Sequence, residues 1–253
     1  MSAQSFQAVM AGLIRYPTYT LEKIRESLPP VSLSEKEERQ LRQMAVDPLV
    51  RKFGYKMSLC RRRDATEVMK LSKDFIDPEI LDEMFYKRFE PTRTSTDLVM
   101  LGVQFLEFAL SDTDCLKLLE SCPPFTRDLM LYDLAKASVL RMVNKATDSP
   151  LPPDSLLASR LFQIIKIECD APAIDQLKTK DPNSKQIPSL KPLTLIFMRV
   201  ASPPYYRMFQ IDDSIAEFLM IQKENALGWK GELPKPFAAM VKVGLCRNPE
   251  ETV

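Results

Sequence analysis

The sequence predicts an α+β protein, in which an all-α bundle precedes a small winged-helix-like α/β module. Apolar residues recur with a helical period through the first half of the chain, and the period shifts towards two beyond it. Prolines are frequent (20) and glycines scarce (6), which is typical of helices separated by proline-marked turns. The Pro-rich polar segment 144–155 is the best boundary. We therefore expect a helical domain over 1–150 and a second domain over 151–253.

Proline breaks and capping residues divide the first half into helices. The spacing predicts a short helix over 3–15 that ends before Pro17. Ser34 and Glu37 fit a capping box, and the helix they open should end at Val46, before Asp47-Pro48. Further helices are expected over 48–60, from 64 or 65 to about 75, from Asp77-Pro78, over 98–110 and from Thr126. Segment 98–110 is apolar nearly all round and should be the central helix of the bundle.

The second half alternates strands with short helices. Strands are expected over 161–167, 193–200 and 205–211, the last two as a hairpin around Pro203-Pro204. One or two helical turns should cover 173–178, and a polar loop 179–191. Helices are expected over 212–223 and 236–244, the second ending at Gly244. The order strand, short helix, hairpin, helix, helix is that of a small winged-helix-like module.

The composition limits the chemistry of the chain. It contains no histidine, so it cannot by itself build a histidine metal site or use histidine as an acid or base. Five scattered cysteines without a CxxC pair indicate reduced thiols, and neither metal nor cofactor is expected in this chain. Lys plus Arg (35) balances Asp plus Glu (34), which gives no general attraction for nucleic acid or an anionic membrane. Without a signal segment or an apolar stretch long enough to span a bilayer, the protein is expected to be soluble and cytoplasmic.

Two groups of residues are candidates for binding, and none for catalysis. Strand 205–211 is a predicted edge strand, which an incoming peptide can extend, and helix 236–244 could supply apolar pockets beside it. By alternation, half of the strand's side chains must face the core and half can line a groove. The candidate peptide-binding residues are Tyr205, Tyr206, Arg207, Met208, Phe209, Gln210, Phe237, Met240 and Val241.

The second group is the basic run Arg61, Arg62 and Arg63, near Lys52 and Lys56. This run is either a solvated helix end or a patch that docks an acidic partner. Paired acids such as Asp82-Glu83 are interpreted as helix caps or solvated faces.

Several segments together resemble a known family. They are LGVQFLEFAL with Gly102, Phe105 and Phe108, then Asp128 and YDLAKASVLRM, and in the second half LFQIIKIECDAPAIDQL, LTLIFMRV, YYRMFQID, SIAEFLMIQ and FAAMVKVGL. In order and spacing, over most of 45–246, these resemble the bacterial accessory proteins of the HvfC type. The family's His-Pro segment stands here as Glu90-Pro91 and its Tyr-Arg start as Tyr55-Lys56. These departures indicate a divergent branch.

The resemblance implies a non-catalytic partner subunit. Members of the family pair, as heterodimers, with multinuclear nonheme iron-dependent oxidases of TIM-barrel fold, and the iron lies in the oxidase. The partner's C-terminal module resembles the recognition elements of ribosomal peptide maturation. It binds the leader of a precursor peptide and presents the precursor's cysteine to the iron. Methanobactin and thiaglutamate maturation are examples, and in length and two-part layout this chain is most similar to the thiaglutamate-pathway partner.

Two other classes of function remain open on the residues alone. A DNA-binding regulator would use the winged-helix-like module and needs a basic recognition helix, yet 236–247 holds only Lys242 and Arg247. A free-standing enzyme would need thiol or carboxylate chemistry without histidine.

Overall fold

The structure, a computed structural model, describes most of the chain. The described residues are 3–15, 20–26, 33–90, 100–141, 157, 161–200, 205–225 and 237–246. The chain divides into two compact units, Met1–Thr66 and Glu67–Val253. Each unit has a hydrophobic core of its own.

The first unit is helical. Its elements are α1 (Ala3–Arg15), α2 (Leu21–Glu26), α3 (Glu35–Val46) and α4 (Pro48–Thr66). The predicted capping box is confirmed, because Ser34 accepts from the backbone N–H of Glu37 and the Glu37 carboxylate accepts from that of Ser34. The core consists of Val9, Leu13, Leu21, Ile24 and Leu41.

Besides α2, which was not predicted, this unit differs from the prediction at the end of α4. α4 continues through the expected break after residue 60 and ends only at Thr66. The helix expected from residue 64 or 65 to about 75 is absent, and only a 3-10 turn, η1 (Ser72–Phe75), forms there. The reason lies outside the segment, because a buried carboxylate, Asp133, accepts from the backbone N–H groups of Leu71 and Ser72.

Glu67–Val253 begins with further helices. They are α5 (Pro78–Asp82), the π-helix η2 (Glu83–Phe89), α7 (Leu101–Ser111), α8 (Thr113–Leu119) and α9 (Thr126–Arg141). Asp77 caps α5 through the N–H of Glu79, with Pro78 in the first turn as predicted. α7 is buried over most of its surface, as expected for a central helix. α2 and α8 were not predicted.

A three-stranded antiparallel sheet follows, and the three expected strands are confirmed. The elements are β1 (Phe162–Cys169), α10 (Ala171–Lys180), β2 (Leu190–Arg199), β3 (Tyr206–Gln210), α11 (Asp213–Asn225) and α12 (Phe237–Lys242). The strand order is β1-β2-β3, so β2 is central and both β1 and β3 are edge strands. α12 is followed by Gly244 at φ 80°, a conformation that glycine adopts without strain.

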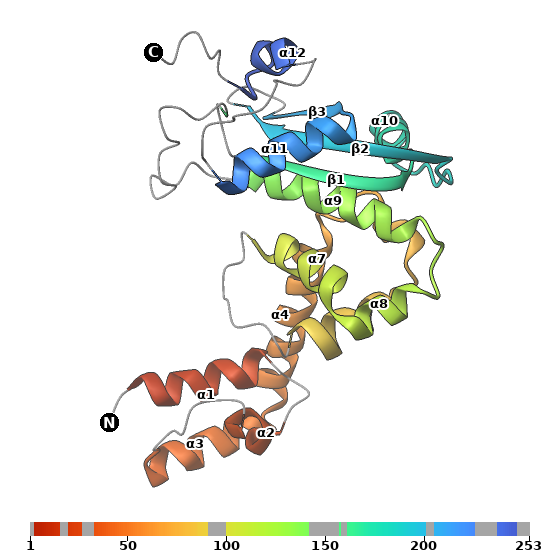
Figure 1. Cartoon of the computed structure of the whole chain (residues 1–253). Coiled ribbons are helices and arrows are strands. Elements are labelled where there is room, and N and C mark those ends of the chain that lie inside the picture. Colours follow the sequence, from red (N-terminus) through yellow and green to blue (C-terminus); the bar gives the residue numbers. More distant parts are fainter. Residues whose placement is uncertain are drawn as a thin grey trace. The chain divides into compact units, whose positions relative to one another are not determined.

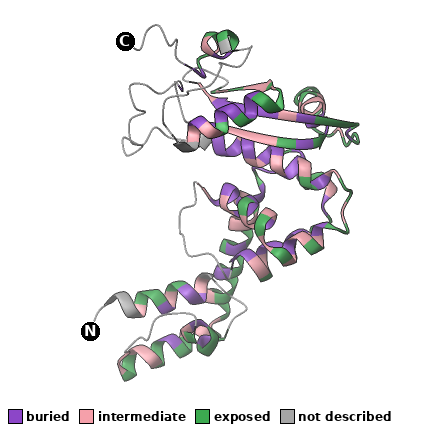
Figure 2. Cartoon of the chain, viewed as in Figure 1, coloured by how far each residue is buried: buried purple, intermediate pink, exposed green. Residues whose placement is uncertain are grey.

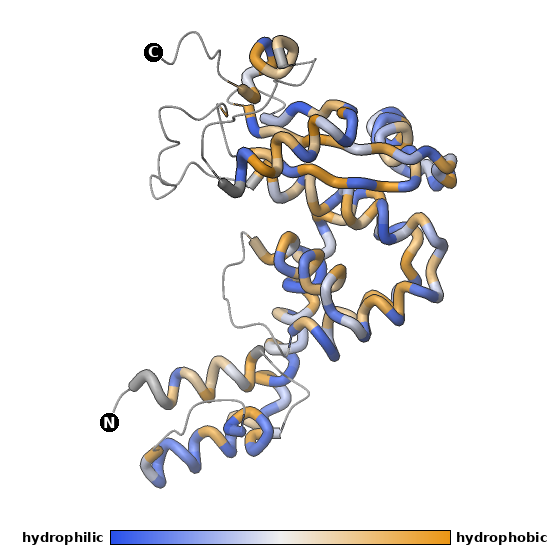
Figure 3. The backbone as a smooth tube through the Cα atoms, viewed as in Figure 1, coloured by the Kyte–Doolittle hydropathy of each residue, from blue (hydrophilic) through white to orange (hydrophobic). Residues whose placement is uncertain are grey.

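Helices cover both faces of this sheet (Figure 1). α9 lies on one face and packs against residues such as Ile167, Leu195 and Phe197. α11 and α12 supply the core of the other face, where Ile196 and Met198 lie. The strands are largely hydrophobic (Figure 3), and α9 is largely buried (Figure 2), because α9 is enclosed by the sheet and by α7.

The compact units do not coincide with the predicted domains 1–150 and 151–253. Tyr132 and Val139 of α9 belong to the same core as Leu195 and Phe197 of β2, so a helix of the expected first domain packs directly on the sheet. The proposed connector, 144–155, lies outside the described residues. None of the described helices has the combination of length and hydropathy that a membrane span requires.

Candidate functional site

β3 is an edge strand, and one side of its backbone has no partner strand among the described residues. In the ladder with β2, Val200 donates to the carbonyl of Tyr205 (3.0 Å) and Ile211 donates to the carbonyl of Thr194 (2.9 Å). Antiparallel pairing alternates, so every second residue of β3 bonds to β2 and the residues between point their N–H and C=O groups away from it. The outward residues are Tyr206, Met208 and Gln210. Among the described residues, no backbone hydrogen bond covers these outward groups.

The other edge, β1, is covered at two points. The outward carbonyl of Phe162 accepts from the Lys223 ammonium of α11 (2.8 Å), and that ammonium also lies 4.7 Å from the centre of the Phe162 ring. Near the opposite end of β1, the outward N–H of Glu168 donates to the Asp128 carboxylate of α9 (2.8 Å). Side chains therefore cap outward backbone groups of β1, whereas no described backbone hydrogen bond covers those of β3.

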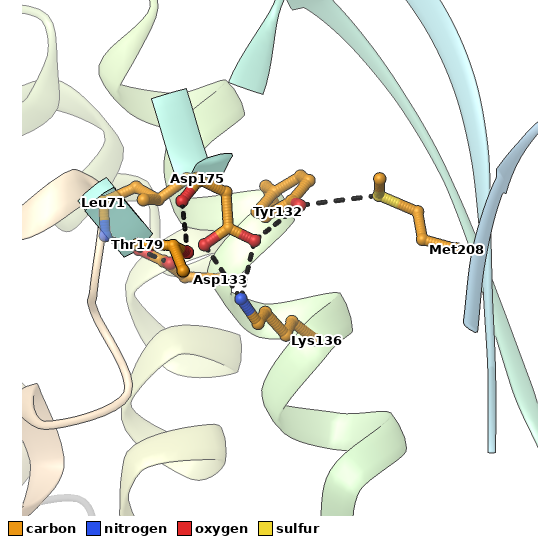
Figure 4. Close-up of polar contacts among 7 residues, drawn as sticks. All are labelled: Leu71, Tyr132, Asp133, Lys136, Asp175, Thr179 and Met208. Carbon is orange, nitrogen blue, oxygen red and sulfur yellow. Dashed lines mark hydrogen bonds and ion pairs between the residues drawn. The ribbon is translucent and has the colours of Figure 1, made fainter. Parts of the chain in front are cut away.

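A polar network braces β3 from beneath (Figure 4). Met208 points towards α9, where its sulfur lies 3.5 Å from the oxygen of the Tyr132 hydroxyl. The same hydroxyl donates to the Asp175 carboxylate of α10 (3.0 Å), which also pairs with Lys136 of α9 (2.6 Å). The Lys136 ammonium lies 5.5 Å from the ring centre of Tyr206. The side chains of two outward residues of β3 thus rest on groups held by α9 and α10.

The protonation states in this network are fixed by burial and by Asp175. Burial and the Asp175 charge raise the pKa of Tyr132 far above its usual range, so its hydroxyl stays a donor. Burial disfavours the charge of Lys136, but the hydrogen bond and charge of Asp175 outweigh that effect and raise the pKa of Lys136. Tyr132 is therefore a neutral phenol and Lys136 a cation, and the network that they form with Asp175 serves as a structural brace.

Asp133, the neighbour of Tyr132, lies on an adjacent face of α9. Its buried carboxylate accepts from the backbone N–H groups of Leu71 and Ser72 and from the Ser72 hydroxyl (2.8 Å). Burial raises the pKa of Asp133 to about 7, although these donors act in the opposite direction. Asp133 holds the turn before η1 against α9 and does not contact the open edge.

The remaining predicted peptide-binding residues differ in how far their side chains are exposed. Arg207 and Gln210 are exposed, whereas Phe209 packs against the core under α11 and Met240 is buried in it. Val241 is partly buried beside that core. The side chain of Phe237 lies outside what the structure describes. Met240 and Phe209 therefore contribute to packing. Of the two α12 candidates whose side chains are described, Val241 is the one that stays partly accessible for an apolar pocket.

Tyr205 precedes β3 in an unusual conformation. Its φ is 67°, a region that bulky residues rarely adopt, and its ring is exposed. The Arg199 guanidinium lies 5.4 Å from the ring centre, and Arg199 also donates to the carbonyl of Leu140 at the end of α9 (2.7 Å). Tyr205 is thus held at the start of the open edge.

A shallow polar pocket lies at the other end of β3. Its volume is about 300 Å³, and Gln210 forms part of its wall. Asp213 also lines this pocket. Its carboxylate accepts from the Thr194 hydroxyl (2.9 Å) and pairs with the Lys166 ammonium (2.8 Å). Most of its wall comes from β1 and β2, so the pocket lies across the strand ends of the sheet and not along the outer edge of β3.

The arginine run lies at the end of α4. Arg63 is exposed and pairs with the adjacent Asp64 (3.3 Å), whereas Arg61 and Arg62 are half-buried. Of the three predicted partner-binding residues, Arg63 is the most accessible.

Within the described ranges no cluster of three His, Cys, Asp or Glu side chains could hold a metal ion. Burial raises the pKa of the Cys115, Cys169 and Cys246 thiols to about 12, which keeps them protonated at neutral pH. These three thiols are therefore poor nucleophiles.

Sequence reasoning missed the network beneath β3. Tyr132 and Lys136 stand four residues apart on α9, a spacing that places them side by side, but the same helix has apolar residues on every face. Asp175 lies on α10, about forty residues away, and no local pattern links it to them. No protein-family model matches the chain, and a search of curated proteins finds no significant relative.

Proposed function

We propose that this chain is a non-catalytic partner subunit of a multinuclear nonheme iron oxidase, with the iron held by the partner. In this proposal the chain binds the leader of a ribosomally made precursor peptide and presents the precursor's cysteine for oxidation. The observation that supports it is the open edge of β3, which lies over a built network instead of being capped as β1 is. The fold proposal that goes with it is a winged-helix-like recognition module made of β1, α10, β2, β3, α11 and α12.

The leader would bind by adding a strand to the sheet. The outward N–H and C=O groups of Tyr206, Met208 and Gln210 would pair with the peptide backbone. Peptide side chains would then alternate between the side of α9, near Lys136, and the side of α11 and α12, near Val241. Main-chain pairing supplies affinity in this mode, and the two flanks supply specificity.

The oxidase contact is assigned to the helical part of the chain, with Arg61, Arg62 and Arg63 as the proposed patch. Binding the leader and the oxidase through separate surfaces would raise the local concentration of the precursor cysteine at the iron. This chain would contribute surfaces to the reaction and no reacting group.

A leader-peptide titration tests the edge. The probe is a synthetic leader from the precursor encoded beside this gene, labelled for fluorescence anisotropy. Gln210→Pro removes an outward N–H without touching the ladder, and we expect it to weaken binding about tenfold. Gln210→Thr, which keeps that N–H, is the matched control and should bind as the parent does. Equal binding of the leader by both variants would contradict the proposed peptide-binding site at β3.

Co-expression with the neighbouring genes tests the partner role. We expect an iron-containing protein to co-elute with this chain at a fixed ratio, with the iron remaining on that protein after the two are separated. Recovery of the chain alone from such cells, together with no affinity for the leader, would remove the proposal.

The DNA-binding alternative receives less support. α12 carries a single basic residue, Lys242, and α11 carries only Lys223, whose ammonium is engaged with Phe162. A gel shift with mixed duplex DNA that responds to Lys242→Ala would favour that alternative instead.

A further inference from the structure

α4 has its large apolar residues on the outside. Leu49, Phe53 and Met57 are 75%, 53% and 37% exposed. Their spacing of four places them on one stripe of the helix. The buried positions of the same helix are the small or polar residues Gly54, Ser58, Ala65 and Thr66. A helix that only stabilised its own unit would show the opposite pattern, with the large apolar side chains buried.

A basic stripe runs beside the apolar one. Lys52, Lys56 and Arg63 are exposed and lie along one flank, with Lys52 and Lys56 one turn apart and Arg63 two turns further on. α4 as a whole contains six basic residues and one acid, Asp64. No described residue forms an ion pair with Lys52 or Lys56. The described residues therefore leave an apolar and a cationic stripe exposed side by side on α4, and the exposed Tyr55 and Leu59 lie on the far side of the cationic stripe.

We infer that this face of α4 docks a protein surface in which carboxylates flank an apolar ridge. The charge pattern selects the partner: a ridge packing on Phe53 would place its acidic flank opposite Lys52 and Lys56. A second copy of this chain would bring like charges together. A bilayer is a uniform plane, whereas here the basic residues lie mainly on one side of the apolar stripe, which favours a partner with a defined orientation.

This inference goes beyond peptide binding at β3 and does not depend on it. It also moves the proposed partner contact along α4, from the arginine run towards Lys52 and Lys56, with Arg63 at the end of the stripe. If the proposed function holds, the oxidase is the protein expected to carry the acidic surface.

A charge-exchange experiment on the full chain tests it. The probe is a synthetic helical peptide of about 20 residues with a leucine stripe flanked by glutamates, and the counterpart carries lysines in place of the glutamates. We expect the glutamate peptide to bind the parent chain, and the double variant Lys52→Glu, Lys56→Glu to bind it about tenfold more weakly. That variant should in turn prefer the lysine peptide.

Two further variants control for charge and for folding. Lys36→Glu with Arg39→Glu makes the same change in net charge at exposed positions of α3 and should leave binding unchanged. Phe53→Ser keeps the charges and should also lose binding, while circular dichroism remains that of the parent.

Three results would overturn the inference. They are no preference between the two peptides, binding of phosphatidylglycerol vesicles that the α4 variants abolish, and a concentration-dependent dimer that Phe53→Ser abolishes. Gln210→Pro serves as the internal reference, because it should impair leader binding and leave the α4 interaction unchanged. Failure at one surface is thus distinguishable from failure at the other.

Discussion

Both edge strands of the sheet, β1 and β3, have backbone groups that point away from β2. Side chains cap such groups on β1, but no described residue caps those on β3. On β1, a lysine from α11 caps the carbonyl of Phe162 and an aspartate from α9 caps the N–H of Glu168. On β3, no described residue caps the outward groups, while α9 and α10 supply a network under the side chains of Tyr206 and Met208. Capping an edge prevents unwanted strand pairing, and this difference between the two edges is the observation behind the strand addition proposed at β3.

α9 connects the two edges. Asp128 near its start bonds to β1, and Lys136, two turns later, lies beside Tyr206 of β3. Asp133 stands between them in the sequence and accepts from the N–H of Ser72, the first residue of η1. One helix therefore closes one edge and supports the other, and variants along it can separate the two roles.

The largest expected effect is a pH dependence of the free energy of unfolding. It comes from Asp133 of α9, the helix that contacts both edges of the sheet. The pKa of Asp133 is raised to about 7 in the folded chain, above the unfolded value of about 4, so the folded chain binds more protons between these limits. The free energy of unfolding should then fall by on the order of 3 kcal/mol as the pH rises from 4 to 7. Denaturant unfolding across that range measures it. Asp133→Asn cannot titrate, so parallel curves for parent and variant would contradict the assignment.

Two single proline substitutions on β3 test the difference between residues whose N–H points to β2 and residues whose N–H points away from it. Arg207 is exposed, but its N–H points to β2, so Arg207→Pro should destabilise the fold by about 2 kcal/mol. Gln210→Pro removes only an outward N–H and should change the stability by less than about 0.5 kcal/mol. Thermal unfolding compares the two. Equal losses would mean that the ladder register is different from the one described.

Most of the fold was predictable because its signals are local. The capping box at Ser34, the proline start at Pro78 and the apolar runs of the three strands each lie within a few residues of one another. The expected helix from residue 64 or 65 was wrong because a residue about sixty positions away, Asp133, takes the backbone N–H groups of that segment. Local propensity cannot foresee such a contact.

The candidate site was predictable only in part. Alternation and hairpin order predicted an edge strand over 205–211, and the structure has the edge strand β3 at Tyr206–Gln210. Which edge residues face outward depends on the register with β2, and the brace depends on Asp175 meeting Tyr132 and Lys136 from another helix. The exposed stripe on α4 was missed because Leu49, Phe53 and Met57 have the spacing of a buried face, and only tertiary packing shows that the opposite face is inside.

A smaller effect is expected when the brace under β3 is broken. Lys136→Met leaves the mostly buried Asp175 without its cation and should destabilise the chain by about 1 to 2 kcal/mol. Because Lys136 also lies over Tyr206, the amide of Arg207 should exchange with solvent faster. Hydrogen exchange by NMR measures this, with the amide of Ile165 on β1 as reference. Equal acceleration on both strands would show a general loosening of the sheet and no brace specific to β3.

The smallest effect concerns the cap on β1. Lys223→Met leaves the carbonyl of Phe162 without its donor and should destabilise the chain by about 1 kcal/mol, whereas Lys166→Met, which breaks an exposed pair with Asp213, should cost less than about 0.5 kcal/mol. Neither change alters the outward groups of β3, so leader affinity should be that of the parent. If uncapping β1 instead created a second binding site for the leader, the open edge would be sufficient without its brace, and the network under β3 would lose its proposed role.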